Sequence, residues 1–292
     1  MIGRLALALE AALIVAGCQG APAPGKAVVV ATIYPLWDLA RQVAGDRAEV
    51  VSLVPPGVEP HDWEPSARDV TVGQRATVFI HSGTGLDASA TRLLAGLRGG
   101  TRVIDASIGL DLLRQGAGVD PHVWLDPTLA RTQVQTIANG LAQADPVGGP
   151  VYLENAAAFV ARLDALDQAF TAGLRDCARR EVVTSHAAFA YLARRYGLTQ
   201  VPIMGAAPEA EPSPADLAAI VQTARRLKVT HVFFEPLVSP RLAQTLAREI
   251  GATALPLDPI EGASREQAAA GTGYVELMQA NLANLRVGLG CR

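Results

Sequence analysis

Short runs rich in valine, isoleucine and phenylalanine alternate with longer helical patterns along this chain, and this alternation constrains its fold most. The first half carries four such runs, at residues 27–32, 48–54, 76–81 and 101–106. A second set of four follows at residues 181–184, 199–204, 230–235 and 253–258. Buried strands separated by helices build a parallel sheet with helices on its faces. We therefore predict an α/β fold with two lobes, each a parallel sheet flanked by helices, although the two sets show no sequence repeat.

A long helical segment lies between the two sets of runs. Along residues 151–174 the apolar positions recur every three or four residues, which places them on one helical face: Phe159, Leu163, Leu166, Phe170 and Leu174. A helix of this length spans roughly 36 Å, about the breadth of a lobe. We predict that it is a rigid linker rather than an ordinary surface helix. The expected domains are residues 26–147 for the N-terminal lobe, 148–176 for the linking helix and 177–292 for the C-terminal lobe.

Chain length and charge exclude some classes of partner. With 292 residues, of which 50% are hydrophobic, the chain can bury one large core or two moderate ones. It carries 25 basic and 28 acidic residues, so its formal net charge is only −3. This balance provides neither the basic surface typical of nucleic-acid-binding proteins nor an acidic tail. We expect a monomer with no nucleic-acid partner.

The N-terminus has the pattern of an export signal. Arg4 precedes an apolar run that contains Glu10 and is too short to span a membrane. The run ends in Val-Ala-Gly-Cys, and small residues directly before a cysteine resemble the lipobox of bacterial lipoproteins. Under this interpretation residues 1–18 contain the lipoprotein signal, Cys18 becomes the lipidated first residue, and residues 19–25 form a tether. An ordinary signal peptide with an incidental cysteine, or a misassigned start, is the alternative.

Two further cysteines remain if Cys18 is lipidated, namely Cys177 and Cys291. An exported protein can keep a disulfide, and an even number of cysteines favours one. A bridge between these two residues would tie the end of the chain to the start of the second lobe. Two unpaired buried thiols are the alternative.

Four side chains that can bind a divalent metal lie near the ends of separate predicted strands or in proline-framed loops: His61, His122, His186 and Asp258. Prolines on both sides of His61 and beside His122 stiffen their loops and restrict the imidazoles. In open α/β sheets, ligands bind beyond the carboxyl ends of the strands. Because two candidates come from each predicted lobe, we expect a metal site in the cleft between the lobes.

Three imidazoles and one carboxylate suit zinc, since neutral imidazole binds borderline metals and the carboxylate offsets the positive charge. A lone histidine in a loop is more often a surface residue, so the prediction depends on the joint placement. Glu235 ends a predicted strand and is expected to accept an imidazole N–H, or alternatively backbone N–H groups at a helix start. His81 is left out because a tetrahedral ion takes four ligands, and His231 lies at the opposite edge of its sheet.

At these residues the chain resembles the zinc- and manganese-binding solute-binding proteins of bacterial ABC importers, the cluster A-I or zinc-uptake-like family. The similarity runs from residue 27 to the C-terminus. Its most specific segments are Pro-His-Asp-Trp-Glu-Pro at 60–65, Asp-Pro-His-Val-Trp-Leu-Asp-Pro at 120–127, Ser-His-Ala-Ala-Phe-Ala-Tyr at 185–191, Phe-Glu-Pro at 234–236 and Leu-Asp-Pro at 257–259. The resemblance implies two α/β lobes joined by one long helix, a metal buried between them, and delivery to a membrane permease.

The resemblance also assigns the ligand positions to His61, His122, His186 and Asp258. Manganese-selective members carry glutamate in place of His186, so the third imidazole favours zinc, with manganese or iron as the alternative cargo. Many zinc-binding members have a histidine- and acid-rich loop before the second ligand, whereas residues 105–120 contain no histidine. The expected protein is a non-enzymatic, extracytoplasmic receptor that its lipid anchors to the bacterial membrane.

A zinc hydrolase and a surface adhesin are the competing functions. Catalytic zinc keeps one position open for water, whereas four protein ligands close the coordination shell, and the sequence lacks a His-Glu-x-x-His motif. An adhesin role, which some family members are said to have, stays open. Because zinc needs deprotonated imidazoles, we expect its affinity to fall as pH drops through the range near ~6.5 where histidine titrates.

Overall fold

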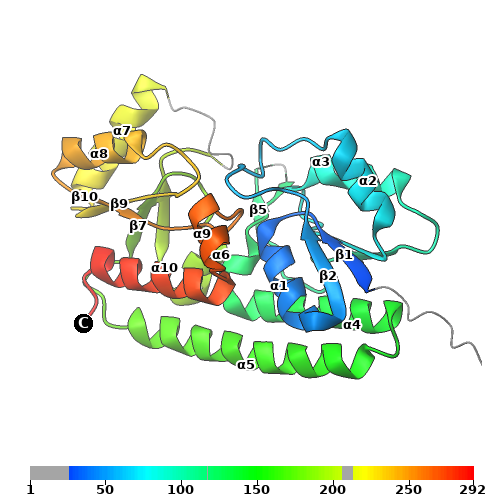
Figure 1. Cartoon of the computed structure of the whole chain (residues 1–292). Coiled ribbons are helices and arrows are strands. Elements are labelled where there is room, and N and C mark those ends of the chain that lie inside the picture. Colours follow the sequence, from blue (N-terminus) through cyan, green and yellow to red (C-terminus); the bar gives the residue numbers. More distant parts are fainter. Residues whose placement is uncertain (1–25, 117, 206–212) are drawn as a thin grey trace, which may run out of the picture.

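Two four-stranded parallel sheets form the frame of the molecule (Figure 1). The computed structural model describes residues 26–116, 118–205 and 213–292. The N-terminal sheet has the order β2-β1-β3-β4 and consists of β1 (Ala27–Ala31), β2 (Ala48–Ser52), β3 (Val78–His81) and β4 (Arg102–Asp105). The C-terminal sheet has the order β10-β9-β7-β8 and consists of β7 (Glu181–Thr184), β8 (Thr199–Pro202), β9 (His231–Phe234) and β10 (Thr253–Pro256). All eight predicted strands are present, which confirms the α/β fold.

The two sheets share one topology. In each, the first strand pairs with the second on one side and with the third on the other, as β1 does with β2 and β3, and β7 does with β8 and β9. The chain therefore reverses its direction of travel across the sheet between the first and third strands. Such switch points are where open α/β sheets bind their ligands.

Helices cover both sheets. Those of the N-terminal half are α1 (Tyr34–Ala44), α2 (Ala67–Arg75), α3 (Ala88–Thr91) and α4 (Pro127–Ala144). Those of the C-terminal half are α6 (Ala190–Tyr196), α7 (Pro214–Arg226), α8 (Arg241–Ile250), α9 (Arg265–Ala270) and α10 (Tyr274–Leu289). Serine capping boxes begin α2, α7 and α9, where the serine and the third helical residue satisfy each other's free backbone N–H groups. A short hairpin of β5 (Arg114–Gln115) and β6 (Gly118–Val119) was not predicted, because two-residue strands carry no periodic pattern.

The predicted linking helix is α5 (Gly149–Gly173), which runs beneath both sheets along the lower edge of the molecule (Figure 1). Its buried residues include Phe159, Leu163, Leu166 and Phe170, which are those of the predicted face. The helix packs against α1 and α4 in the N-terminal half and against α10 in the C-terminal half. The domain limits at residues 147 and 176 stay a prediction.

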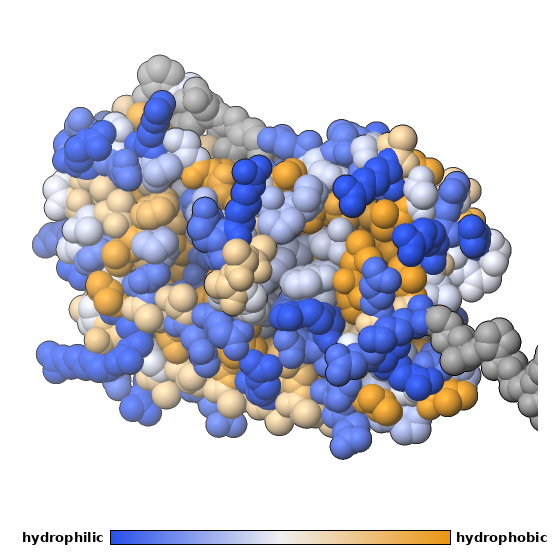
Figure 2. All heavy atoms as spheres, viewed as in Figure 1, coloured by the Kyte–Doolittle hydropathy of each residue, from blue (hydrophilic) through white to orange (hydrophobic). Residues whose placement is uncertain are grey.

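One hydrophobic core is continuous through both halves, because α5 contributes to each. It joins residues of the N-terminal sheet, such as Phe79, to residues of the C-terminal half, such as Phe189 and Leu285. A smaller cluster joins Val183 and Val232 of the C-terminal sheet to residues of α7 and α8, such as Leu246. Polar residues cover most of the face drawn in Figure 2, with apolar areas between them.

A disulfide joins Cys177 to Cys291, as favoured from the sequence, and closes a loop with a sequence separation of 114 residues. This bond fastens the end of α10 to the segment that follows α5. The predicted signal, the tether and the lipidated Cys18 lie outside the described residues. In the part of the chain that the structure describes, no helix combines the length and apolar character needed to cross a membrane.

Candidate metal centre

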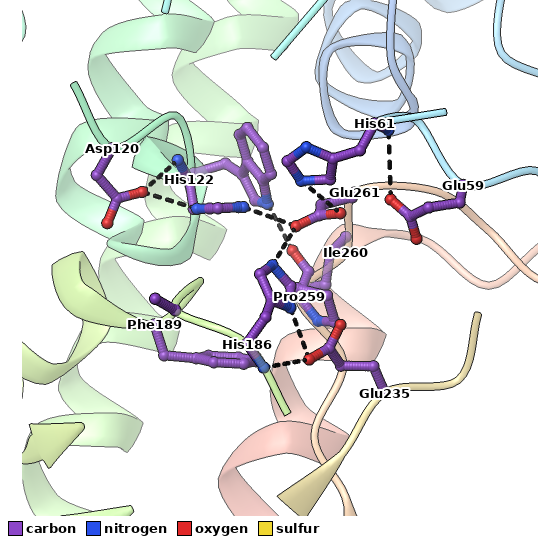
Figure 3. Close-up of polar contacts among 12 residues, drawn as sticks. Glu59, His61, Asp120, His122, His186, Phe189, Glu235, Pro259, Ile260 and Glu261 are labelled. Carbon is purple, nitrogen blue, oxygen red and sulfur yellow. Dashed lines mark hydrogen bonds and ion pairs between the residues drawn. The ribbon is translucent and has the colours of Figure 1, made fainter. Parts of the chain in front are cut away.

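Three histidines and one glutamate from distant parts of the chain meet between its two halves (Figure 3). His61 lies in the loop after β2, His122 directly precedes a short 3₁₀ turn (Val123–Leu125), and His186 follows β7. The fourth member, Glu261, lies in the loop after β10. One ligand atom from each residue lies within 4.8 Å of all the others. The structure therefore brings together the three histidines that were predicted to bind the metal.

All three imidazoles approach the carboxylate of Glu261 through Nε2. The Nε2 atoms of His122 and His186 lie 2.7 and 3.1 Å from Oε1, and Nε2 of His61 lies 3.5 Å from Oε2. Among the described residues, Nε2 of His61, Nε2 of His122 and Oε2 of Glu261 are buried atoms without a well-aligned hydrogen bond. Buried polar atoms almost always have a partner, so their convergence fits a cation. Three imidazole nitrogens and one carboxylate oxygen form a typical zinc ligand set.

Carboxylates contact two of these imidazoles at Nδ1, the ring nitrogen that does not face Glu261. Nδ1 of His122 lies 2.7 Å from Oδ1 of Asp120. Nδ1 of His186 lies 2.7 Å from Oε1 of Glu235, which also accepts the backbone N–H of His186 at 3.1 Å. Contacts of this kind orient the ring and leave Nε2 available to a metal. The geometry supports the imidazole-acceptor role expected for Glu235, whereas Asp120 was missed although it lies only two residues before His122.

The topology of the C-terminal sheet explains how His186 and Glu235 meet. His186 lies two residues after β7, and Glu235 directly follows β9. These strands pair with each other at the switch point of the sheet. Because parallel strands end at the same edge, residues that follow them lie side by side although they are 49 positions apart in sequence.

Burial and charge determine which of these groups carry protons. Burial favours neutral His186, but hydrogen bonds to Glu235 and Glu261 outweigh it and raise the pKa of His186 to about 10. Burial likewise opposes the charge on His122, yet the negative charge of Glu261 and the hydrogen bond to Asp120 raise the pKa of His122. Burial disfavours the carboxylate form of Glu261, but the charge of His122 and contacts with the histidines hold its pKa well below the usual range.

Asp258, the carboxylate predicted as the fourth ligand, lies outside this cluster, and Glu261 lies within it instead. Oδ1 of Asp258 accepts the backbone N–H of Ile260 at 2.8 Å, and Oδ2 accepts the side-chain N–H of Gln267 at 2.7 Å. Burial raises the pKa of Asp258 to about 6, although both hydrogen bonds oppose this shift. The prediction chose Asp258 because it lies nearest the end of β10. The carboxylate that joins the cluster belongs to Glu261, three residues further along the loop. Glu261 is a second acidic residue in the same segment, and this was the only sequence signal for it.

The remaining two histidines lie apart from the cluster. His81 ends β3, and His231 begins β9, where its Nδ1 lies 3.0 Å from Oγ1 of Thr230. Neither belongs to the group of possible ligands within residues 26–116, 118–205 and 213–292. Leaving them out of the predicted set agrees with this arrangement.

A sequence profile of one protein family, described as zinc-uptake complex component A, periplasmic (ZnuA), matches residues 29–288. The high-affinity zinc uptake system protein ZnuA of Bacillus subtilis is 34% identical to this chain, over 94% of the chain and 93% of that protein. The zinc-binding lipoprotein AdcA of Streptococcus pneumoniae is 36% identical over 98% of this chain, which spans only 60% of AdcA.

Solved structures show the same architecture. The Zn(II)-bound ZnuA-like domain of S. pneumoniae AdcA has a TM-score of 0.81 and 38% sequence identity, with 91% of this chain and 99% of that domain covered. The laminin-binding protein Lmb of Streptococcus agalactiae, described as bifunctional with adhesin and metal transporting activity, has a TM-score of 0.83 and 33% identity. Its comparison covers 91% of this chain and 100% of Lmb.

Proposed function

This chain belongs to the zinc-uptake component A family, and we propose that it captures a zinc ion between its two halves and delivers it to the permease of an ABC-type importer. The observation that carries this proposal is the convergence of three imidazoles and one carboxylate from four distant segments. The family is one of transport components, so the chain is a binding protein and not an enzyme. Four protein donors also fill a tetrahedral shell and leave no position for a catalytic water.

Zinc reaches the site on the side of His61. The His61 side chain is 15% exposed, whereas the other three donors are buried almost completely. The three imidazoles then replace water molecules of the ion, and the carboxylate of Glu261 offsets part of its charge. Because Asp120 and Glu235 already hold two rings in place, the ion meets an ordered set of donors.

Zinc suits this donor set better than manganese does. Imidazole nitrogen binds zinc well, whereas manganese prefers sites built mainly from carboxylate, carbonyl and water oxygen. Three of the four donors here are imidazoles. The relatives ZnuA of B. subtilis and AdcA of S. pneumoniae are described as zinc proteins, in agreement with this assignment.

We further propose that the mature chain is a monomer anchored to the extracytoplasmic face of the bacterial membrane through a lipid on Cys18. The signal-like residues before Cys18 and the lipoprotein description of AdcA support the anchor. An anchored receptor with a tether stays close to the permease to which it hands the ion.

One preparation tests both the cargo and the anchor. The full-length chain is expressed in a bacterium and isolated from membranes without added metal. Elemental analysis is expected to find about one zinc per chain with little manganese, because the described residues contain one cluster of three imidazoles and one carboxylate. Mass spectrometry of the N-terminal peptide is expected to show a lipid on Cys18. Protein that carries manganese instead of zinc would contradict the cargo, and an unmodified Cys18 peptide would contradict the anchor.

Zinc binding is expected to release protons at neutral pH. The pKa of His186 is raised to about 10, so its ring holds a proton at neutral pH that zinc must displace, and the raised pKa of His122 acts in the same direction. A protonated nitrogen cannot bind zinc, and the apparent affinity should therefore rise with pH until His186 is deprotonated. Each displaced proton changes the dissociation constant about tenfold per pH unit.

Calorimetry at pH 7.5 in two buffers with different ionisation enthalpies measures this release. At least one proton per zinc is expected, so the pH-dependent range extends well above the ~6.5 of an ordinary histidine. Identical heats in the two buffers, together with equal zinc affinity at pH 6 and pH 8, would show that the donors are already deprotonated.

A further inference from the structure

We propose that Asp258 is a positioning residue, whose carboxylate holds Ile260 in a left-handed backbone conformation that directs Glu261 toward the three histidines. This inference rests on the proposed role of Glu261 as a metal ligand. Asp258 thereby controls how tightly zinc is held, although it does not contact the ion.

The backbone at Ile260 is strained. Its φ is +58°, a region that β-branched residues very rarely adopt. Among the described residues the only other non-glycine position with positive φ is Lys228, just after the end of α7. Ile260, in contrast, is fully buried and directly precedes Glu261. Strained backbone persists where the surrounding structure enforces it, and it often occurs at functional sites.

The side chain of Asp258 holds Ile260 in this conformation. Its Oδ1 accepts the N–H of Ile260 at 2.8 Å and so closes the turn, while its Oδ2 accepts the Nε2–H of Gln267 at 2.7 Å. Asn281 on α10 holds the Asp258 backbone, accepting its N–H at 2.8 Å and donating to its carbonyl oxygen at 2.6 Å. Both carboxylate oxygens of Asp258 thus accept hydrogen bonds, one from Ile260 and one from Gln267 in α9, which explains why the residue lies outside the cluster.

The segment on either side of Glu261 is also held by the N-terminal half. Nε1–H of Trp124 donates to the carbonyl oxygen of Pro259 at 2.8 Å, and the N–H of Gly57 donates to that of Ala263 at 2.7 Å. With these contacts on both sides, the turn at Ile260 is the element that sets the direction of the Glu261 side chain. Figure 3 shows Pro259 and Ile260 leading to Glu261, whose carboxylate points at the imidazoles.

The central test compares Asp258→Ala with Asp258→Asn in the full chain. Zinc dissociation constants are measured by competition with a chelating indicator, and absorption spectra of the Co²⁺-loaded proteins report the ligand set. Asp258→Ala removes both acceptors and is expected to weaken zinc binding by about 10- to 100-fold, as loss of groups that orient metal ligands does. Asp258→Asn keeps an oxygen that can close the same turn and is expected to remain within about fivefold of the parent. Both variants should keep the Co²⁺ spectrum of the parent, whereas Glu261→Gln should alter it.

A second variant separates positioning from general stability. Glycine adopts positive φ without strain, so in the Ile260→Gly variant the turn no longer depends on the hydrogen bond from residue 260 to Asp258. In that background Asp258→Ala is expected to weaken zinc binding by about threefold or less. The matched control is Asp87→Ala, because Asp87 is also a buried carboxylate and accepts hydrogen bonds from Thr32 and Ser82. Asp87→Ala is expected to lower the unfolding temperature and leave zinc affinity within about twofold.

Three results would overturn the positioning role: unchanged zinc affinity in Asp258→Ala, an equal loss in the Asp87→Ala control, or an undiminished loss in the Ile260→Gly background. A Co²⁺ spectrum that changes in Asp258→Asn but not in Glu261→Gln would identify Asp258 as the ligand instead. A parent chain that fails to bind zinc would refute the proposed function, and this result differs from all of the others.

Discussion

Replacing His122 by alanine is expected to weaken zinc binding by roughly 100- to 1,000-fold. Four-ligand zinc sites bind with about 10–16 kcal/mol, or roughly 2.5–4 kcal/mol per ligand, and each factor of ten corresponds to about 1.4 kcal/mol. His122 should lie at the upper end of this range. Its ring is fully buried and fixed by Asp120, so the substitution removes a donor that is already oriented toward the site.

Zinc affinity in this experiment is measured by competition with an indicator of known dissociation constant at constant pH. His81→Ala is the matched control, because it removes an imidazole from the end of a strand outside the cluster. The control is expected to bind zinc within about twofold of the parent, since it changes no donor. A loss below about tenfold in His122→Ala would mean that the zinc site does not use this imidazole.

Removing the disulfide by the double substitution Cys177→Ala and Cys291→Ala is expected to lower the free energy of unfolding by about 4–5 kcal/mol. The bond spans 114 residues, so it restricts the unfolded chain strongly, and long closed loops lose the most entropy. Denaturant unfolding of both proteins in the presence of a chelator measures this effect without the added stabilisation from bound zinc.

The metal site should survive this change. The disulfide lies at the end of α10, and none of the four donors is within ten positions of either cysteine except His186, which belongs to a separate strand edge. Zinc affinity of the folded double variant is therefore expected to match that of the parent. The entropic argument fails if the two proteins unfold at the same denaturant concentration with equal slopes.

Secondary structure was predictable because local patterns encode it. The apolar runs at β1, β3, β7 and β9 are central strands of their sheets, and each contains at least two adjacent buried apolar residues, as expected where helices cover both faces of a sheet. The face of α5 was equally visible, since its buried residues follow the helical repeat. The β5–β6 hairpin was not predicted, because its two-residue strands are too short to show an alternation of apolar and polar residues.

Local sequence patterns did not identify the fourth donor. Asp258 and Glu261 both lie just beyond β10 in the same apolar segment, and their spacing in sequence does not tell which one faces the histidines. The answer depends on the left-handed turn at Ile260 and on the hydrogen bonds that Asp258 forms with Gln267 and Asn281. Such contacts come from helices that follow later in the chain.

Residue order along the chain was sufficient to predict the α/β class, the position of the linking helix and the three histidines that converge, because burial periodicity and the residues that follow strand ends are local properties. The choice of Glu261, the support of His122 by Asp120, and a hydrophobic core shared by both halves required the folded chain. These features depend on distances between segments that are far apart in sequence. Such distances arise only when the sheets, α5 and α10 pack together.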